Sequence, residues 1–294
     1  MKSISFILLL LLLSNCDKNS LSDKITPSAS LVQPFGTQST FEMSTWNIEH
    51  FPKKGQESVT TLTRLIKELE IDLIAFQEID NEEYFWIMLD SLPDYNGFCS
   101  SYPKDELKLG LIYNQNLISV SNLQQLFIED TYNFPRPPLY AFIQIKKGNV
   151  IAFNFSLINI HLKAFHDSLS ILRRKNAVSK LKHLIDIRLL TSSDKDVIIL
   201  GDWNDDLSDE EDENIFSPFL TDSMNYSFLL PAENPQISYP AWQSRIDHIL
   251  ITNDVKTEYK NGLTEVLQPD TEFDGYFDII SDHRPVAAKF YIFE

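Results

Sequence analysis

The sequence is poor in cysteine, glycine and positive charge, and each shortage excludes a class of protein. Two cysteines in 294 residues are too few for a small domain held together by several disulfides. Eight glycines and 12% aromatic residues exclude a collagen-like or low-complexity chain. Lys and Arg number 25 against 42 Asp and Glu, a net charge of −17, so the protein does not coat nucleic acid passively. A polyanionic substrate would need bound cations that reverse the charge locally.

Long apolar runs are also scarce, and the clearest one lies at the N-terminus. Residues 4–13 are apolar except for Ser5 and follow Lys2, and this run is too short to span a bilayer. It leads into Leu13-Ser14-Asn15-Cys16, which resembles a bacterial lipoprotein signal whose cysteine is lipidated and becomes the new N-terminus. An ordinary secretory signal with a chance cysteine is the alternative. An acylated Cys16 leaves Cys99 without a disulfide partner, so Cys99 is expected to be buried and inert.

The rest of the chain divides into a tether and one domain. After a signal over residues 1–16, residues 17–40 are rich in Ser, Thr, Pro, Lys and Asp and predict a flexible tether. Over residues 41–294, segments with strand and helix periodicity interleave and no second tether recurs, which predicts a single α/β domain. Val197–Leu200 is fully apolar, and such a strand needs cover on both faces, so helices should flank the sheets.

The apolar periodicity predicts the individual elements. Strands are expected over residues 41–48, 72–76, 107–113, 139–145, 150–160, 195–200, 246–252 and 286–293. Helices are expected over residues 59–69, 82–92 and 168–190. The third helix is expected to place six apolar residues against the core, namely Leu172, Val178, Leu181, Leu184, Ile185 and Leu189.

Polar clusters lie at the ends of apolar runs at six places, and this repetition is the main functional signal in the chain. The clusters are Trp46-Asn47-Ile48-Glu49, Gln77-Glu78, Asn159-Ile160-His161, Gly201-Asp202-Trp203-Asn204, Arg245-Ile246-Asp247-His248 and Ser281-Asp282-His283. Strands that repeatedly end in acids, amides and imidazoles indicate one shared pocket for metal-assisted attack on a phosphate.

The acids and amides suggest metal binding and activation of water. Glu78 follows a strand too apolar to lie at an edge, and Mg²⁺ prefers one or two carboxylates with several waters, so Glu78 is the first candidate ligand. Asn47 could add an amide oxygen. Asp202 and Asn204 share a face if the backbone stays extended, where they could orient an attacking water. A turn over these residues is an equally good interpretation.

The imidazoles and cations suggest contacts to an anionic substrate. His161 and Lys163 are two residues apart, so both could reach one anionic group, and Arg173 is a further candidate. A structural His161 and a solvated Arg173 are the alternatives.

A histidine base also needs a carboxylate to orient it. His283 requires an acid on one ring nitrogen to act as a base through the other, and Asp247 or Asp282 could serve. His248 alternates to the other side of its strand from Asp247, so it is expected in the core or at the surface.

Taken in order, these six clusters resemble the motifs of the endonuclease/exonuclease/phosphatase family, the DNase-I-like metal-dependent phosphoesterases. The resemblance extends from Phe41 to Phe293. It implies a four-layer α/β sandwich, in which two central mixed β-sheets are flanked by helices and the pocket lies at the strand ends. It also implies that residues 41–294 form a catalytic domain.

The resemblance further implies a role for each metal-site and base residue. Glu78 and Asn47 would hold Mg²⁺, with Mn²⁺ or Ca²⁺ as alternatives. His283, oriented by Asp247, would be the general base or a phosphate contact. Asp282 would support a metal or His283.

The remaining implied roles concern the substrate. His161 would steady the phosphoryl oxygens or protonate the leaving group, and Asp202 and Asn204 would orient the nucleophile. Water would attack phosphorus in line while the metal neutralises the developing charge. Apurinic-site endonucleases usually lack a histidine at the position of His161, which disfavours that branch.

These inferences predict a secreted or membrane-anchored, divalent-metal-dependent phosphodiesterase, with a nuclease as the first expectation. A phosphatase, a phospholipid hydrolase of the phosphoinositide or sphingomyelin type, and a non-catalytic binding lipoprotein are the alternatives. The expected partners are a phosphoester substrate, either nucleic acid or a phospholipid headgroup, and a membrane bound through the N-terminal lipid. We expect a monomer in the bacterial cell envelope, at its periplasmic or outer surface.

Overall fold

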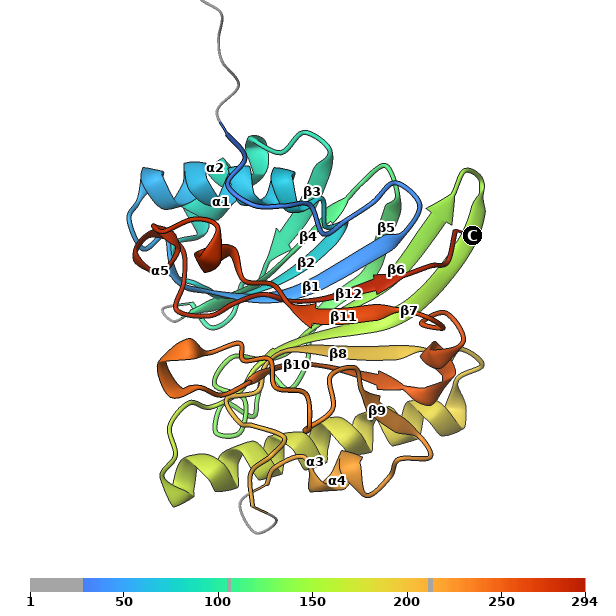
Figure 1. The fold of residues 1–294 in the computed structure, drawn as a ribbon. Helices are drawn as coiled ribbons and strands as arrows, with labels where there is room; N and C mark the ends of the chain where they lie inside the picture. The colour runs from blue at the N-terminus through green and yellow to red at the C-terminus, as the bar shows by residue number, and fades with distance from the viewer. Residues whose placement is uncertain (1–28, 105–106, 211–213, 294) are drawn as a thin grey trace, which may run out of the picture.

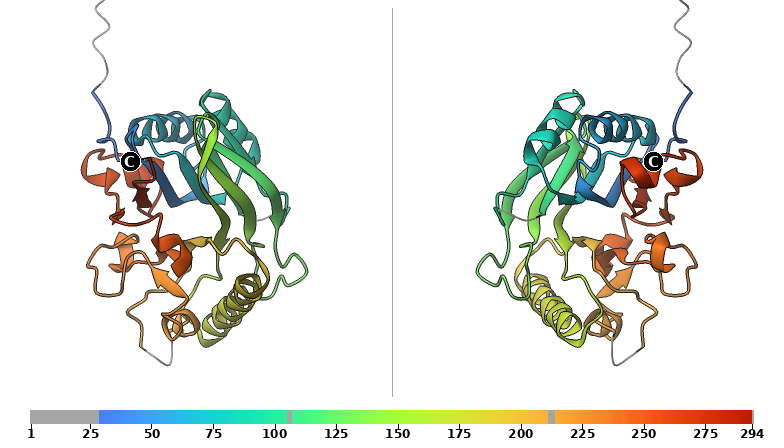
Figure 2. Two further views of the ribbon diagram at one scale, coloured as in Figure 1. Left: turned by 90° about the vertical axis from the view of Figure 1, so that its right-hand side faces the viewer. Right: turned by 90° about the vertical axis from the view of Figure 1, so that its left-hand side faces the viewer.

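The computed structural model describes residues 29–104, 107–210 and 214–293. Two six-stranded sheets pack face to face and helices cover their outer faces, which gives four layers (Figures 1 and 2). The first sheet is covered by α1 (Gln56–Leu69), α2 (Glu82–Asp90) and α5 (Tyr276–Ile279). The second is covered by α3 (Ser168–Thr191) and α4 (Ser217–Leu220). This is the predicted four-layer α/β sandwich with a DNase-I-like arrangement.

Both sheets are mixed. The first has the order β11 (Leu263–Val266), β12 (Val286–Phe290), β1 (Phe41–Phe51), β2 (Leu73–Ile79), β4 (Lys108–Asn114) and β3 (Tyr95–Cys99). The second has the order β5 (Ile118–Gln125), β6 (Leu139–Lys147), β7 (Val150–His161), β8 (Val197–Asp202), β10 (Asp247–Thr252) and β9 (Tyr226–Phe228). Each sheet holds one parallel pair, β1 with β2 and β7 with β8, and all other pairs are antiparallel. A helix, α1 or α3, connects each parallel pair.

Alternation along the strands separates the core into layers. Phe41 and Met43 of β1 belong to the apolar cluster between the sheets, whereas Trp46 and Ile48 belong to the cluster under α1. The layer between the sheets becomes polar toward the ends of β1, β2 and β7, where Thr45, Gln77 and Asn159 are fully buried.

Asn159 links the two sheets through hydrogen bonds of its side-chain amide. Its Nδ2 donates to the carbonyl oxygens of Phe76 and Gly110, both at 3.0 Å, on β2 and β4 of the opposite sheet. Its Oδ1 accepts from Gln77 Nε2 at 2.8 Å, and Gln77 Oε1 accepts from Thr45 Oγ1 at 3.2 Å. Buried polar groups that are paired in this way fix one relative position of the surfaces they join.

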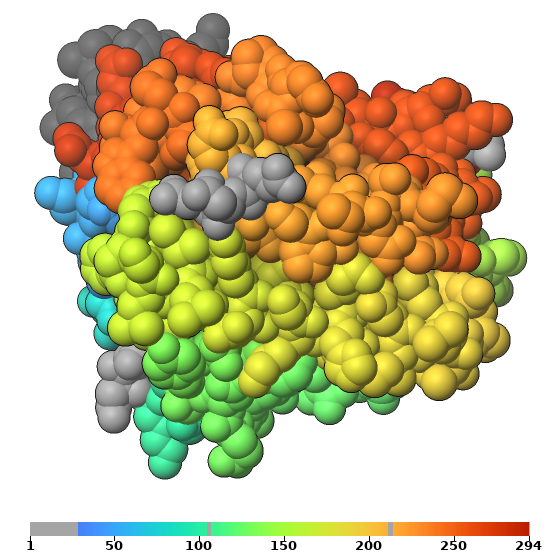
Figure 3. All heavy atoms as spheres, turned by 90° about the horizontal axis from the view of Figure 1, so that it is seen from below, coloured from blue at the N-terminus to red at the C-terminus, as the bar shows by residue number. Residues whose placement is uncertain are grey.

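The predicted strands and helices are all present, and the elements that were missed are short or lie at edges. The structure adds β3, β5, β9, β11, two short α-helices and the 3₁₀ turns η1 (Pro240–Trp242), η2 (Asn253–Lys256) and η3 (Pro269–Thr271). The predicted face of α3 needs correction, because Leu172 and Leu184 are exposed while Arg174 and Ala177 are buried. Figure 3 shows this outer face, where α3 lies between the β5–β6 region and the segments that follow β8.

The chain packs against the domain earlier than the expected boundary at Phe41. Residues 29–40, the N-terminal arm, contain no helix or strand, but Val32 and Phe35 are buried in the cluster under α1. The backbone N–H groups of Leu31 and Val32 donate to Glu68 Oε2, at 2.6 and 3.2 Å.

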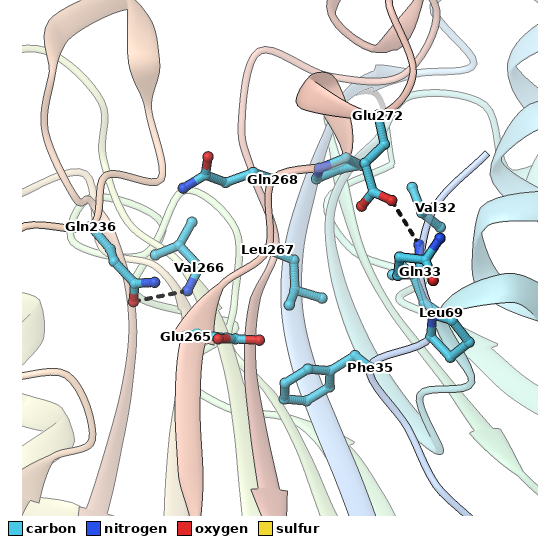
Figure 4. Close-up of a pocket in the computed structure, with 12 residues that line it drawn as sticks. Val32, Gln33, Phe35, Leu69, Gln236, Glu265, Val266, Leu267, Gln268 and Glu272 are labelled. Carbon is cyan, nitrogen blue, oxygen red and sulfur yellow. Dashed lines mark hydrogen bonds between the residues drawn. The ribbon is translucent and has the colours of Figure 1, made fainter. Parts of the chain in front are cut away.

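The arm also contacts the segment that leads to the last polar motif. Gln33 N donates to Glu272 Oε2 at 3.0 Å, across a cavity of about 280 Å³ that Phe35 and Leu267 also line (Figure 4). Because these contacts involve residues far apart in sequence, the described part of the predicted tether belongs to the folded domain.

Two expectations concern the N-terminus and the thiols. The predicted signal and its lipidated Cys16 lie outside the described residues, as does the tether up to residue 28. Within the described residues, no helix has the length and apolar character needed to cross a membrane. Cys99 is buried as expected, and burial raises the pKa of its thiol to about 12, so it stays protonated at neutral pH.

Replacing Phe35 with alanine is expected to destabilise the protein by about 3 kcal/mol, because it leaves a cavity between the arm and α1. Thermal unfolding of the full chain followed by circular dichroism measures this change. The matched control is Leu190→Ala, since Leu190 is 86% exposed and should change stability by less than about 0.5 kcal/mol. Equal melting temperatures for Phe35→Ala and the wild type would show that the arm is not packed.

Candidate active site

The six polar motifs converge at one end of the two sheets. The parallel strands β1 and β2 carry Asn47 and Glu78 near their C-terminal ends, and β7 and β8 end at His161 and Asp202. β10 is antiparallel to β8, so its first residue, Asp247, pairs with Asp202. His283 lies just before β12 and completes the group.

Two overlapping clusters have the side chains expected at a metal site. His161 Nε2 lies 3.7 Å from Glu78 Oε1 and 3.5 Å from Asp202 Oδ2. Asp202 also forms a cluster with Asp247 and His283, and within each cluster the ligand atoms lie within 4.8 Å of one another. Asp202 therefore lies between a side with Glu78 and a side with His283.

Asn47 connects the acids of the two sheets. Its Nδ2 donates to Glu78 Oε1 at 3.1 Å and to Asp202 Oδ2 at 3.0 Å, so one amide contacts both carboxylates. Its Oδ1 accepts from the backbone N–H of Glu49 at 3.0 Å. The amide is in place beside Glu78, but in this arrangement its nitrogen, and not the predicted ligand oxygen, faces the acids.

His283 is oriented by Asp247, one of the two acids that the sequence offered. His283 Nδ1 lies 2.8 Å from Asp247 Oδ2, whereas Asp282 Oδ1 lies 3.8 Å from Nε2. Asp247 Oδ2 also accepts from Ser238 Oγ at 2.7 Å. His283 Nε2 faces Asp202 Oδ2 at 4.0 Å, so the ring nitrogen that is free for chemistry faces the metal-site acids.

Hydrogen bonds to β1 hold the segment around His283 in place. Ser281 Oγ donates to the carbonyl of Asn47 at 2.7 Å and accepts from His283 N at 2.9 Å. The hydroxyl of Tyr276 accepts from Trp46 Nε1 at 3.0 Å and donates to the carbonyl of His283. The first and last motifs are therefore joined through buried bonds.

Burial and mutual repulsion set the charges of these groups. Burial, together with the charge of Asp247, raises the pKa of Asp202 to about 7. Burial lowers the pKa of His161 well below 6.5, with further lowering by Arg136, so His161 is neutral. The carboxylates of Asp247, Asp202 and Asp282 outweigh burial and raise the pKa of His283 to about 10. The site thus offers a neutral donor at His161 and a cation at His283.

Asn204 and Asp282 lie at the margin of the cluster. The backbone turns at Asn204, where φ is 53°, so it does not stay extended past Asp202. Asn204 N donates to Asp202 Oδ1 at 2.8 Å, and its side chain donates to the carbonyl of Leu162 at 3.2 Å. Asp282 is partly exposed, and its N–H donates to Glu49 Oε2 at 2.8 Å.

Two cations lie next to Leu162, the residue that follows His161. Lys163 is its neighbour in the chain, and Arg136 Nη1 donates to its carbonyl at 3.3 Å. The charges of Arg173 and Arg136 add to burial in lowering the pKa of Lys163. Lys163 Nζ lies 4.2 Å from the ring centre of Phe165, and the Arg173 guanidinium lies 4.8 Å from that of Tyr132.

Arg174, the residue after Arg173 on α3, is fully buried. Its Nε donates to Asp205 Oδ2 at 2.9 Å, and its Nη1 donates to the carbonyls of Lys163 and Phe165 at 2.9 and 2.6 Å. It therefore supports the loop that carries Lys163.

A row of rings extends outward from His283. The Tyr239 ring centre lies 4.8 Å from that of His283 and 5.6 Å from that of Trp242. Trp242, 59% exposed, lies 4.9 Å from His166. This row borders the site with planar apolar surface.

His248 is in the core, one of the two places expected for it. It packs edge-on against Phe216 and Phe228, and its Nε2 lies 3.0 Å from the carbonyl of Asp205. Burial lowers its pKa to about 4, so it is neutral.

Sequence reasoning missed three residues at or near the site, namely Ser238 and Tyr239, which contact Asp247 and His283, and Arg136, which donates to the carbonyl of Leu162 next to His161. All three come from segments outside the strand ends, and only Arg136 stood in a recognisable feature, the run Pro135-Arg136-Pro137-Pro138. A single arginine between prolines, shortly before a strand, is a sequence feature that could have drawn attention to Arg136.

The model of the endonuclease/exonuclease/phosphatase family matches residues 44–283 of this chain. The chain belongs to the endonuclease/exonuclease/phosphatase family. Its match spans all six motifs, from β1 to His283, so the family covers the whole described domain from its first strand to its last catalytic motif. A comparison with curated protein sequences finds no match.

Solved structures of the family share the fold at low sequence identity. A humanized TDP2 from D. rerio is 14% identical with a TM-score of 0.62, covering 86% of this chain and 99% of that one. The catalytic domain of human Nocturnin is 17% identical with a TM-score of 0.62, covering 86% and 95%. A mannosyl-6-phosphatase from Bacteroides thetaiotaomicron is 14% identical with a TM-score of 0.62, covering 85% and 99%. These similarities establish the fold alone.

Family membership and the clustered ligands make this protein a metal-dependent phosphoesterase. The donors fit a divalent cation, because Glu78 and Asp202 bring carboxylates and His161 an imidazole to one point. When bound, such a cation neutralises charge that develops on a phosphoryl group. The protein's own contribution is to hold these donors in place and, through Asp247, to keep His283 protonated beside them.

The Asp247→Asn variant is expected to lower the pKa of His283 by about 2 in metal-free protein, because it removes the nearest negative charge. Histidine NMR titration in EDTA measures this shift, with the exposed Asp254→Asn as the control. A folded-state pKa above the unfolded value stabilises the protein below pH 6.5, and the stabilisation is lost as the pH rises through about 10. The wild type should therefore melt at a higher temperature than Asp247→Asn below pH 6.5, and this difference should shrink as the pH rises from 6.5 to about 10. A wild-type His283 that titrates near 6.5 would contradict the assignment.

Proposed function

We propose that this protein is a secreted, Mg²⁺-dependent phosphodiesterase whose first substrate class is nucleic acid. The observation that carries the proposal is the rim of the site, where cations and exposed rings flank the acid and histidine cluster. Lys163 and Arg136 lie next to Leu162, directly after His161, Arg173 is on the helix α3 that follows, and Tyr239, Trp242 and His166 extend from His283.

The cations support a substrate with more than one phosphate. One phosphoryl group at the metal site would contact His283, so further cations near the site favour a neighbouring negative charge. On a chain with net charge −17, a local cationic group is what a polyanion requires. A sphingomyelin-type headgroup carries no second phosphate and leaves these cations unused.

The rings support a substrate with bases. Stacking of a base on an exposed aromatic side chain is worth about 1–3 kcal/mol and tolerates any sequence. Trp242 and the 66% exposed Phe165 offer such surfaces at the border of the site. A sugar phosphate is the second candidate, because a sugar ring can pack on Trp242 in the same way and a mannosyl-6-phosphatase is among the similar structures.

Mg²⁺ is the proposed ion because the donors are chiefly oxygens. Glu78 and Asp202 supply carboxylates, and Mg²⁺ keeps several waters, one of which would lie where Asn204 and Asp202 can orient it. The His161 imidazole makes Mn²⁺ the first alternative.

A substrate panel tests the activity. With Mg²⁺ we expect the wild type to cleave DNA or RNA faster than it releases phosphate from sugar phosphates or headgroups from phospholipid vesicles, and EDTA to stop the reaction. Glu78→Gln should reduce the rate by at least about 100-fold without loss of melting temperature. The exposed Glu83→Gln is the matched control and should keep full activity. If the protein releases phosphate from sugar phosphates and cleaves no other substrate, it is a phosphatase and the nuclease proposal is wrong.

We further propose that the protein is anchored in the bacterial cell envelope through a lipid on Cys16. The support is the Leu13-Ser14-Asn15-Cys16 sequence after an apolar run. Metabolic labelling with a radioactive fatty acid should mark the wild type, and Cys16→Ser should abolish the label. Recovery of an unlabelled wild-type protein from the medium would contradict the anchor.

A further inference from the structure

A second group of carboxylates lies at the end of the first sheet opposite the active site. Glu42 is at the start of β1 and Asp72 directly precedes β2, whereas Asn47 and Glu78 lie near the other ends of these parallel strands. The phosphoesterase chemistry uses neither Glu42 nor Asp72.

Glu42 is fully buried and only one of its carboxylate oxygens is paired. Oε1 accepts from the backbone N–H of Thr37 at 3.2 Å and from the hydroxyl of Thr40. Oε2 is buried with no hydrogen-bond partner among the residues that the structure describes. A buried carboxylate oxygen without a partner is costly, so it needs a proton or a cation.

Asp72 adds a second negative charge at the same place. Its Oδ2 accepts from Glu42 N at 3.3 Å, and its Oδ1 accepts from Asn114 Nδ2 at 3.2 Å. Burial raises the pKa of Glu42 to about 8, and the charge of Asp72 adds to the shift. Burial also raises the pKa of Asp72. The charge of Asp72 thus disfavours ionisation of Glu42, whereas the hydrogen bonds from Glu42 favour ionisation of Asp72.

The pair borders a cleft with an acidic lining. Thr37, Thr40 and Asp72, the three residues that hydrogen-bond to Glu42, line a cavity of about 580 Å³ together with Glu70 and Asp94. Among the lining residues, all of which belong to the described chain, Lys67 is the one cation. The unpartnered Oε2 of Glu42 is therefore buried beside a cleft whose lining carries several acidic side chains and one basic side chain.

We infer that Glu42 and Asp72 form a second divalent-cation site, separate from the active site, that takes a hard ion such as Ca²⁺. Carboxylate oxygens from both residues, with the hydroxyl of Thr40 and waters from the cleft, supply the oxygen ligands such an ion prefers. Binding releases the proton that Glu42 holds in the absence of the ion, so affinity rises with pH. The ion joins the ends of β1 and β2 to the N-terminal arm, because Thr37 and Thr40 belong to the arm.

Calcium binding to the full-chain protein tests the inference in a Glu78→Gln background, which weakens the active-site metal. After treatment with EDTA and dialysis, Ca²⁺ at about ten times its dissociation constant should raise the melting temperature by about 3 °C. Adding Glu42→Gln should abolish this rise, and the exposed Glu57→Gln should leave it unchanged. Titration calorimetry should count one Ca²⁺ in the Glu78→Gln protein and none in the double variant.

Two further measurements distinguish a cation bound between Glu42 and Asp72 from a proton shared by these two acids. The Ca²⁺-dependent rise should be larger at pH 8 than at pH 6, and Asp72→Asn should weaken it in the same way as Glu42→Gln. Glu42→Gln alone should retain phosphoester hydrolysis, because it leaves the other end of the sheet intact. A Ca²⁺-dependent rise in melting temperature that persists after Glu42→Gln would overturn the proposed site. So would the absence of this rise in the protein that retains Glu42. In the latter case the pair holds a proton.

Discussion

The active site depends on the register between two sheets that share no strand. Asn47 and Glu78 come from one sheet, whereas His161, Asp202 and Asp247 come from the other. Apolar packing between the sheets is non-directional and does not by itself set their relative position to a fraction of an ångström. The three hydrogen bonds of the Asn159 amide, two to carbonyls of the opposite sheet and one to Gln77, are directional and buried. They lie next to the catalytic cluster, where the register matters most.

Electrostatics couples the two halves of the site once they are in register. Asp202 contacts the Asn47 amide on one side and faces the His283 imidazole on the other. Its buried charge is unfavourable alone, and the same field keeps His283 protonated. The site thus places an acid, Asp202, and a protonated imidazole, His283, side by side.

The sequence predicted the fold and the core of the site because both follow from patterns along single strands. A strand that ends in His161 or Asp202 carries its polar residue to a sheet edge whatever the neighbouring loops do. Residues from loops carry no such pattern, which is why Ser238 and Tyr239 were not predicted. At Asn204 a left-handed backbone forms the turn, one of the two interpretations that the sequence left open. On α3, Arg174 is buried in an ion pair with Asp205 and Leu172 is exposed, so a polar interaction outweighed the apolar pattern there.

The docked arm changes how an anchored enzyme would meet its substrate. If Cys16 carries a lipid, only residues 17–28 separate it from the packed chain, a span of at most roughly 40 Å even when fully stretched. Catalysis would then be confined to a thin layer next to the bilayer. Tension on the anchor would pass first to the contacts of Leu31 and Val32 with Glu68 on α1, and then to the contact between Gln33 and Glu272, on the segment that leads to His283. The tether that localises the enzyme would therefore also transmit force to the end of the domain that carries the active site.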